Sequence, residues 1–312
     1  MKKENLGFIF PGQGSQKIGM LSDLAARYPV VGRTFEEASD VLGYDLWDLV
    51  QNGEQEAINL TERTQPLLLT ASVAVWRIWE ERQGSEPGLM AGHSLGEWSA
   101  LVCANAVAFQ DAVKLVRMRG AFMQDAVAPG EGAMGAIMGV DDDVIRSVCE
   151  QSAQGGVVSA VNYNSPGQVV IAGDAAAVAR AVDGLKAAGA KRAVPLPVSA
   201  PFHTSLMRPA ADRLAEHIMD TAFSAPSVPV VHNVHARTES DPEVIKTLMI
   251  EQIYSPVLWV DCIKTMVDQG IDTMVECGAG KVVGGLAKRI DKGLNVYATE
   301  DCDSLDQSLT SL

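Results

Sequence analysis

The chain has 312 residues, of which 47% are hydrophobic and 21% charged, as expected for a soluble globular protein with a large buried core. Its formal net charge of −14 argues against nucleic acid as a general partner, because binding to phosphates needs a basic surface. The five cysteines are scattered without a CxxC pair. We therefore expect no disulfide framework and no metal site, and a reducing cytoplasm fits best.

The predicted elements alternate between strands and helices from the N-terminus onward. The apolar run LGFIF predicts a buried strand at residues 6–10 and is too short for a signal peptide or a membrane span. Further along, residues 61–81 predict a long helix, 88–92 a strand and 94–105 another helix. This alternation predicts a parallel sheet with helices on both faces.

The middle of the chain predicts elements in the order strand, helix, strand, strand, helix, strand, which is the ferredoxin-like motif. These are expected at residues 132–140, 141–153, 157–174 (two strands around a turn), 175–190 and 191–199. We therefore expect a small domain of residues 128–198, inserted into a larger α/β domain of residues 1–127 and 199–312. The larger domain resumes with a helix at 204–223 and strands at 228–234, 273–277 and 295–299.

A candidate nucleophile lies in the sequence GHSLG at residues 92–96, which follows a predicted strand and opens a predicted helix. This is the pattern of a nucleophile elbow, with Ser94 at the sharp turn. The helix dipole and the backbone N–H of Leu95 would then face an oxyanion. The alternative is a glycine-rich turn in which Ser94 caps the helix, with Glu97 completing a capping box.

A serine needs a base, and His203 is the best candidate among the histidines. It is predicted to follow a strand and precede a helix, where catalytic groups of α/β sheets collect. His93 adjoins Ser94, so its side chain should point elsewhere and support the turn. The remaining histidines are expected to be structural or at the surface: His217, His232 and His235.

Arg119 interrupts the apolar stripe of the helix predicted at residues 111–127. One interpretation is an arginine whose stem is buried while its charge reaches water. The other is a bidentate clamp on a substrate carboxylate inside an apolar pocket. Arg117, two residues away, should point elsewhere.

Several motifs occur in the order seen in the malonyl-CoA:acyl carrier protein transacylases, and the chain resembles this family from about residue 6 to about residue 290. The motifs are PGQGSQ (11–16), TQP (64–66), GHSLGEWSA (92–100), MRGAFMQ (118–124), NYNSPGQ (162–168), APFH (200–203) and EQIYSPVLW (251–259). The resemblance implies a hydrolase-like α/β domain with a ferredoxin-like insertion, as the elements themselves predict.

The resemblance also implies roles for individual residues. Ser94 would be the acylated nucleophile and His203 its base, oriented by the backbone carbonyl of Gln252 in place of a triad acid. Arg119 would bind the malonyl carboxylate. The remaining implied residues are the oxyanion-hole amides of Gln13 and Leu95 and the pocket side chains Gln65, Met123 and Asn162.

The implied reaction moves a malonyl group from malonyl-CoA to the phosphopantetheine thiol of acyl carrier protein, in fatty acid synthesis. One thioester replaces another, so no metal or other cofactor is expected. Two residues depart from the family pattern, Trp98 where tyrosine is usual and Arg117 where an acid is common. Phe202, just before His203, resembles the residue of related acyltransferase domains that select malonyl groups. Its bulky ring would leave little room for the α-methyl group of a methylmalonyl substrate.

The expected partner raises an electrostatic question, because acyl carrier proteins are acidic and so is this chain. Basic residues near the C-terminus and beside the insertion would have to dock it; the alternative is that they form a solvated surface. They are Lys281, Lys288, Arg289, Lys191 and Arg192. We expect a monomer.

Three alternative functions remain at this stage. A serine esterase or thioesterase would place an Asp or Glu in the triad and an HGGG-type loop in the oxyanion hole, and neither is evident. A non-catalytic binding module would not need the set of Ser94, His203 and Arg119. A stand-alone malonyl acyltransferase that serves a polyketide synthase shares all of these motifs.

Overall fold

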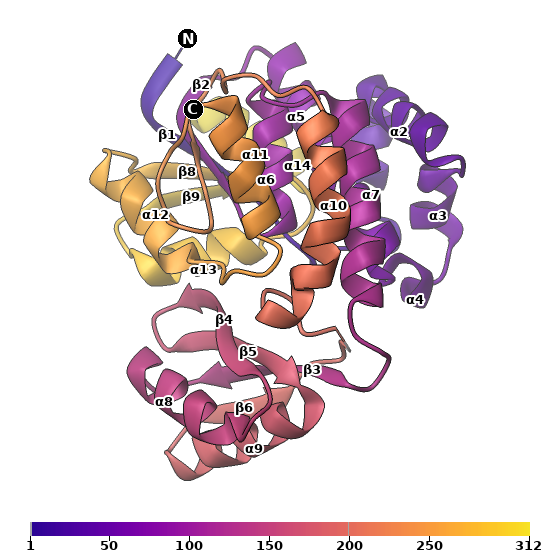
Figure 1. The fold of residues 1–312 in the computed structure, drawn as a ribbon. Helices are drawn as coiled ribbons and strands as arrows, with labels where there is room; N and C mark the ends of the chain where they lie inside the picture. The colour runs from indigo at the N-terminus through magenta and orange to yellow at the C-terminus, as the bar shows by residue number, and fades with distance from the viewer. Residues whose placement is uncertain (1, 199) are drawn as a thin grey trace.

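The computed structural model describes residues 2–198 and 200–312, which form a large α/β domain and a smaller domain beneath it (Figure 1). Within these residues the large domain contains a five-stranded parallel sheet in the order β7-β2-β1-β8-β9. The strands are β1 (Lys2–Phe10), β2 (Glu86–Gly92), β7 (Val230–Val231), β8 (Thr273–Glu276) and β9 (Asn295–Ala298). This is the predicted fold class.

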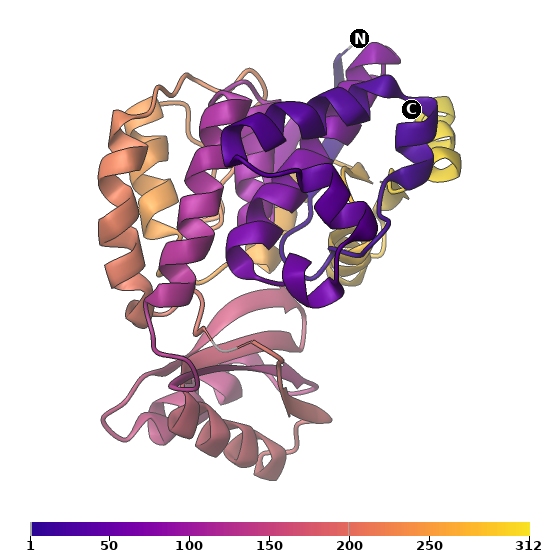
Figure 2. The same cartoon turned by 90° about the vertical axis from the view of Figure 1, so that its right-hand side faces the viewer.

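Helices cover both faces of this sheet because side chains of the central strands alternate between two apolar clusters. In β1, Phe8 and Phe10 pack into one cluster and Ile9 into the other. The helices, with one 3₁₀ turn, are α1 (Ser22–Arg27), α2 (Pro29–Leu42), α3 (Leu46–Asn52), α4 (Gln55–Ile58), α5 (Thr61–Glu81), α6 (Leu95–Cys103), α7 (Phe109–Asp125), η1 (Ser205–Met207), α10 (Arg208–Asp220), α11 (Pro242–Glu251), α12 (Trp259–Asp268), α13 (Val282–Ile290) and α14 (Cys302–Ser311). Helix α2 packs on α5 and α7, as Figure 2 shows.

The small domain has the predicted βαββαβ order. Its elements are β3 (Gly132–Met138), α8 (Asp142–Ala153), β4 (Val158–Ser165), β5 (Gln168–Asp174), α9 (Ala175–Ala187) and β6 (Arg192–Pro195). The strands form an antiparallel sheet in the order β4-β5-β3-β6, and α8 and α9 cover it through a separate apolar cluster. Strand β6 ends at Pro195, earlier than predicted, and residue 199 lies outside the described residues.

The two domains are joined by backbone hydrogen bonds. In the small domain, Tyr163 donates its N–H to the carbonyl of Val257, 3.1 Å away, and Val257 donates to the carbonyl of Val161, 2.8 Å away. These bonds fix β4 against the large domain beside the carboxyl ends of β1 and β2. Phe10 and Gly92, the last residues of those two strands, lie side by side in the sheet. The candidate site lies at this edge.

The strand predicted at residues 228–234 is shorter than expected, because β7 contains only Val230 and Val231. The chain leaves the sheet where His232 and Asn233 use their polar groups elsewhere: His232 donates its N–H to Arg237, and Asn233 donates its N–H to Glu97. In the described part of the chain no helix is long and apolar enough to cross a membrane.

Candidate active site

Ser94 lies on a sharp turn between β2 and α6. Its backbone angles of φ 51° and ψ −105° are strained for a residue with a side chain. The flanking glycines make the turn possible, because a Cβ on Gly92 would lie 1.9 Å from the Gly96 carbonyl, and one on Gly96 would lie 2.2 Å from the Phe10 carbonyl oxygen. The turn therefore has the geometry of a nucleophile elbow.

The capping box predicted for this turn is wrong. Ser94 makes no side-chain bond to the start of α6, because its hydroxyl points to His203. Glu97 does not reach back to Ser94 either. Its carboxylate accepts from His232, Asn233 and Gln252 instead.

His203 is hydrogen-bonded to the serine and is held from behind. Its Nε2 lies 2.8 Å from Ser94 Oγ, and its Nδ1 lies 2.9 Å from the backbone carbonyl oxygen of Gln252. Since a carbonyl only accepts, Nδ1 carries the proton and Nε2 is free to take the serine proton. His203 lies in the loop between β6 and η1, with φ 63°, and not directly after a strand as predicted.

The charge state of His203 fits a base. Burial, and secondarily the positive charge of Arg119, lower the pKa of His203 to about 3. We therefore expect the acid limb of kcat/KM with acetyl-CoA to lie well below pH 6.5, the ordinary imidazole pKa. In Arg119→Ala the limb should move to higher pH, because one cause of the shift is removed. Limbs near pH 6.5 in both proteins would contradict this assignment.

The free energy of unfolding should also depend on pH through His203. Between pH 6.5 and about pH 3 the histidine binds a proton in the unfolded chain but not in the folded one. Its contribution is therefore complete above pH 6.5 and is lost as the pH falls toward 3. Chemical denaturation at several pH values measures this change.

Arg119 is buried, with 1% of its surface exposed, so of its two interpretations the charge that reaches water is wrong. Its Nη2 donates to Ser94 Oγ at 3.2 Å and to Gln252 Oε1 at 2.8 Å, and its Nη1 donates to Gln65 Oε1 at 2.8 Å. Among the described residues its Nε has no partner. A buried guanidinium held by neutral groups beside a nucleophile is suited to receive a carboxylate.

A cavity of about 360 Å³ opens above Ser94, between the two domains. It is lined by residues from the predicted set together with others: Gln13, Ser94, Met123, Asn162, Phe202 and His203, with Gly14, Gln16, Asn59, Thr61, His93, Met134, Leu196, Pro197 and Val198. Gln65 does not line the cavity but contacts the site by accepting a hydrogen bond from Arg119.

Leu95 is the first residue of α6, so its N–H is one of the groups that an α-helix leaves unpaired.

Sequence reasoning missed Asn233, which ties the elbow to the end of β7. Its Oδ1 accepts the N–H of Ser94 at 2.7 Å, and its Nδ2 donates to the Gly92 carbonyl at 2.8 Å. The sequence signal for this role was the polar pair His232-Asn233, which follows the apolar run VPVV. His93 points away from Ser94 as predicted, and its Nε2 lies 2.8 Å from Asn164 Oδ1 on β4.

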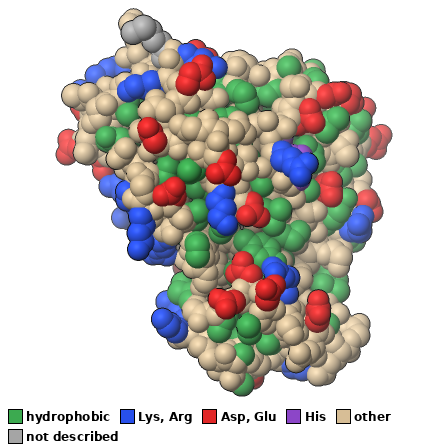
Figure 3. All heavy atoms as spheres, turned by 90° about the vertical axis from the view of Figure 1, so that its left-hand side faces the viewer, with side chains coloured by type: hydrophobic (Ala, Val, Ile, Leu, Met, Phe, Trp, Pro, Cys, Tyr) green, Lys and Arg blue, Asp and Glu red, His purple; other side chains and the backbone are tan. Residues whose placement is uncertain are grey.

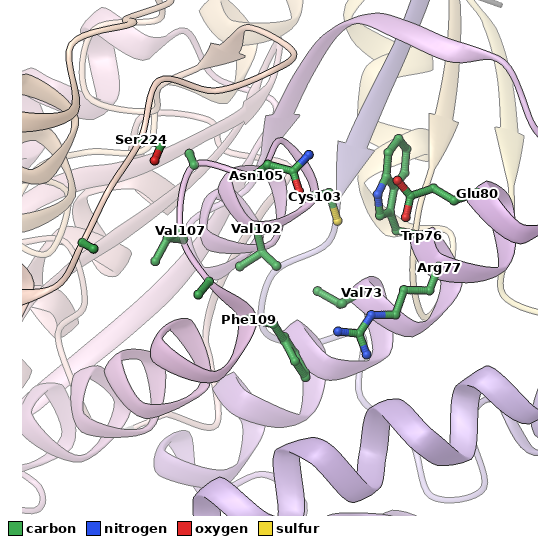
Figure 4. A pocket seen from close by; sticks show the side chains of 13 residues that line it. Val73, Trp76, Arg77, Glu80, Val102, Cys103, Asn105, Val107, Phe109 and Ser224 are labelled. Atoms are coloured by element: carbon green, nitrogen blue, oxygen red, sulfur yellow. The ribbon is translucent and has the colours of Figure 1, made fainter.

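A second cavity, of about 440 Å³, lies between α5 and the start of α7, away from Ser94 (Figure 4). Arg77 in its wall is already paired with Glu37, 2.8 Å away. Its thiol, Cys103, is a poor nucleophile, because burial raises the pKa of Cys103 well above its usual value. This cavity therefore lacks the chemistry of the first one.

The basic residues proposed for docking lie at the surface. Lys281 pairs with Glu300 at 2.6 Å, Lys288 donates to the Leu294 carbonyl, and Arg289 donates to Gln168 at 2.8 Å. Lys191 and Arg192 are exposed at the start of β6. Figure 3 shows Lys and Arg side chains gathered at one edge of the molecule, just above the small domain.

These features define a class of enzyme. An elbow serine and a neutral histidine lie at one cavity of an α/β fold, and a buried arginine is bonded to the serine hydroxyl. These are the parts of a serine acyltransferase. In agreement, residues 7–289 match the acyl transferase domain family. Among the described residues, no group of three or more His, Cys, Asp or Glu side chains is placed to hold a metal ion.

Comparison with known proteins narrows the class. The chain is 55% identical to the malonyl CoA-acyl carrier protein transacylase of Salmonella typhimurium. The 303 aligned residues cover 97% of this chain and 98% of that protein. The protein of that name from Escherichia coli K12 is 54% identical over 302 residues, with coverages of 97% and 98%. The chain belongs to the malonyl CoA-acyl carrier protein transacylase family.

Solved structures agree with this assignment. The acyl carrier protein S-malonyltransferase of Vibrio cholerae superposes with a TM-score of 0.96 at 55% identity, over 97% of this chain and 99% of that one. A malonyl-transacylase solved in complex with a type II polyketide acyl carrier protein superposes with a TM-score of 0.98 at 52% identity, over 99% and 100% of the two chains.

Proposed function

We propose that the protein transfers the malonyl group of malonyl-CoA to the phosphopantetheine thiol of acyl carrier protein, through a malonyl-serine intermediate. The observation that carries this proposal is the buried guanidinium of Arg119, 3.2 Å from the hydroxyl of Ser94. A carboxylate on the acyl group would pair with that charge while the thioester carbonyl lies at the serine. The names of the relatives support the same substrates.

The first half-reaction acylates the serine. Ser94 Oγ attacks the thioester carbon as His203 Nε2 accepts the hydroxyl proton, and the Gln252 carbonyl orients the histidine through Nδ1. We assign the oxyanion to the backbone N–H groups of Gln13 and Leu95. The tetrahedral intermediate then expels the CoA thiolate, which receives the proton from His203.

The second half-reaction repeats these steps with the carrier-protein thiol as the nucleophile. One thioester replaces another, so the proposal requires no metal or redox cofactor. Arg119 explains transfer in place of hydrolysis, because an acyl group clamped in a partly closed cavity remains oriented until a thiol arrives.

A serine esterase is the weaker alternative. Its triad would require a carboxylate on Nδ1 of the histidine. Within the described residues no Asp or Glu is hydrogen-bonded to His203, whose Nδ1 donates to a backbone carbonyl.

Fatty acid synthesis is the proposed pathway, with a cytoplasmic location. The complex of a similar transacylase with a polyketide carrier protein favours polyketide synthesis as a second pathway. Comparing kcat/KM with the two classes of carrier protein separates these pathways. The monomeric state stays a prediction.

Docking of the acidic carrier protein should depend on the basic residues of α13. We expect the double substitution of Lys288 and Arg289 by Glu to raise KM for carrier protein about tenfold or more, because like charges replace complementary ones. KM for malonyl-CoA should stay unchanged. The matched control is Lys114→Glu, at an exposed lysine on α7. An unchanged KM for carrier protein would exclude this surface.

The proposed function is tested by supplying malonyl-CoA and holo acyl carrier protein and quantifying malonyl-carrier protein and free malonate. The proposal predicts that malonyl-carrier protein accumulates much faster than malonate. Release of malonate alone would identify a thioesterase. Equal use of acetyl-CoA would show that the acyl carboxylate is not selected.

A further inference from the structure

Glu97 is a buried carboxylate that the mechanism above does not use. It lies on α6, one turn after Ser94, and its side chain is 0% exposed. Burying a carboxylate is costly unless its oxygens are hydrogen-bonded. Its partners therefore indicate what it does in this site.

Glu97 accepts three hydrogen bonds. Its Oε1 lies 2.7 Å from His232 Nδ1, and its Oε2 accepts the N–H of Asn233 at 3.1 Å and Nε2 of Gln252 at 2.7 Å. An ionised carboxylate can accept all three, because it has only acceptor sites. The bond to Gln252 connects Glu97 to the reaction groups.

That bond fixes which way the Gln252 amide points. Nε2 of Gln252 donates both to Glu97 and to the carbonyl of Ser94, which is 3.0 Å away. Its Oε1 therefore faces Arg119 Nη2 at 2.8 Å. The flipped amide would set its NH₂ group against the guanidinium and its oxygen against two other oxygens.

Gln252 in turn holds both groups that act on the acyl-serine. Its backbone carbonyl accepts from His203 Nδ1, and its side-chain oxygen accepts from Arg119. Glu97 also acts on Arg119 through charge. Burial lowers the pKa of Arg119 to about 10, and the negative charge of Glu97 opposes that shift.

We propose that Glu97 is a positioning residue for acyl selection: it fixes the Gln252 amide and so holds Arg119 beside Ser94 in the geometry that accepts an acyl carboxylate. Glu97 contacts no substrate in this account. The inference rests on the proposed function, because it concerns the choice of malonyl over other acyl groups.

The test measures kcat/KM for malonyl-CoA and acetyl-CoA in Glu97→Gln. A glutamine retains the size of Glu97 but has a single acceptor oxygen and no charge. We expect the malonyl-to-acetyl ratio to fall about tenfold or more, the loss that corresponds to one weakened charge-assisted hydrogen bond. In an Arg119→Ala background the same substitution should leave the ratio unchanged, because Glu97 acts through Arg119.

The control is Glu276→Gln, which removes another buried carboxyl group. Glu276 is 1% exposed and accepts from the backbone N–H groups of residues 282–284, at the start of α13. The Glu276→Gln variant should be less stable and should keep the wild-type malonyl-to-acetyl ratio, so loss of a buried carboxyl group alone does not mimic the effect.

A wild-type ratio in Glu97→Gln, with only a lower stability, would overturn the proposal and make Glu97 structural. If this variant does not fold, Glu97→Asp keeps the charge with a shorter reach, and a wild-type ratio there overturns the proposal equally. Failure of the proposed function is distinguishable, because the unmodified protein would then show no preference for malonyl-CoA in the first place.

Discussion

Replacing Ser94 with alanine should lower malonyl transfer by about 10⁴-fold or more, because the covalent route is lost and no other hydroxyl replaces it. His203 and Arg119 would remain in place around a cavity that still binds thioesters. The loss should therefore appear in kcat, with little change in KM. Steady-state transfer to holo acyl carrier protein measures it.

The matched control is Ser99→Ala on the same helix. Ser99 is buried, and within the described residues its hydroxyl has no hydrogen-bond partner. It should retain near wild-type kcat, since it lies outside the catalytic set. Transfer by Ser94→Ala at more than about 1% of the wild-type rate would contradict nucleophilic catalysis by this serine.

The second large effect is expected for Arg119→Ala. We expect kcat/KM for malonyl-CoA to fall by about 10²–10³-fold, the loss when a desolvated charge pair with a carboxylate is removed. The rate with acetyl-CoA should be unchanged or higher, because that acyl group has no carboxylate to pair. The preference between the two substrates therefore disappears or inverts.

Arg117→Ala provides the comparison for Arg119. Arg117 lies two residues away on α7 and is exposed, so its removal should leave the selectivity unaltered. Equal losses with malonyl-CoA and acetyl-CoA in Arg119→Ala would contradict the clamp and indicate a structural role for the arginine.

Local patterns predicted most of the fold because they depend on neighbours in the chain. The helix expected at residues 61–81 is α5, Thr61–Glu81, and the order of elements in the insertion is as predicted. The short length of β7 could not be predicted, because Val230 and Val231 lie in an apolar run whose pattern predicts a longer strand. What ends that strand is the contact of the next two residues with distant partners.

The site could be predicted only where its signal is local. The elbow is a local pattern, and periodicity placed Arg119 in an apolar stripe, but it did not decide between a buried charge and one that reaches water. The partners of Glu97 could not be predicted, since they lie more than 130 residues further along the chain. The spacing of Ser94 and Glu97 suggested a capping box, but in the folded protein Glu97 is bonded to His232, Asn233 and Gln252.

The most direct test of the account is the intact mass of the protein after brief incubation with malonyl-CoA, followed by mapping of the modified peptide. The account predicts one malonyl group per chain, on Ser94, that holo acyl carrier protein removes as malonyl-carrier protein. A folded protein that carries no adduct, or carries it on a residue other than Ser94, would contradict the account.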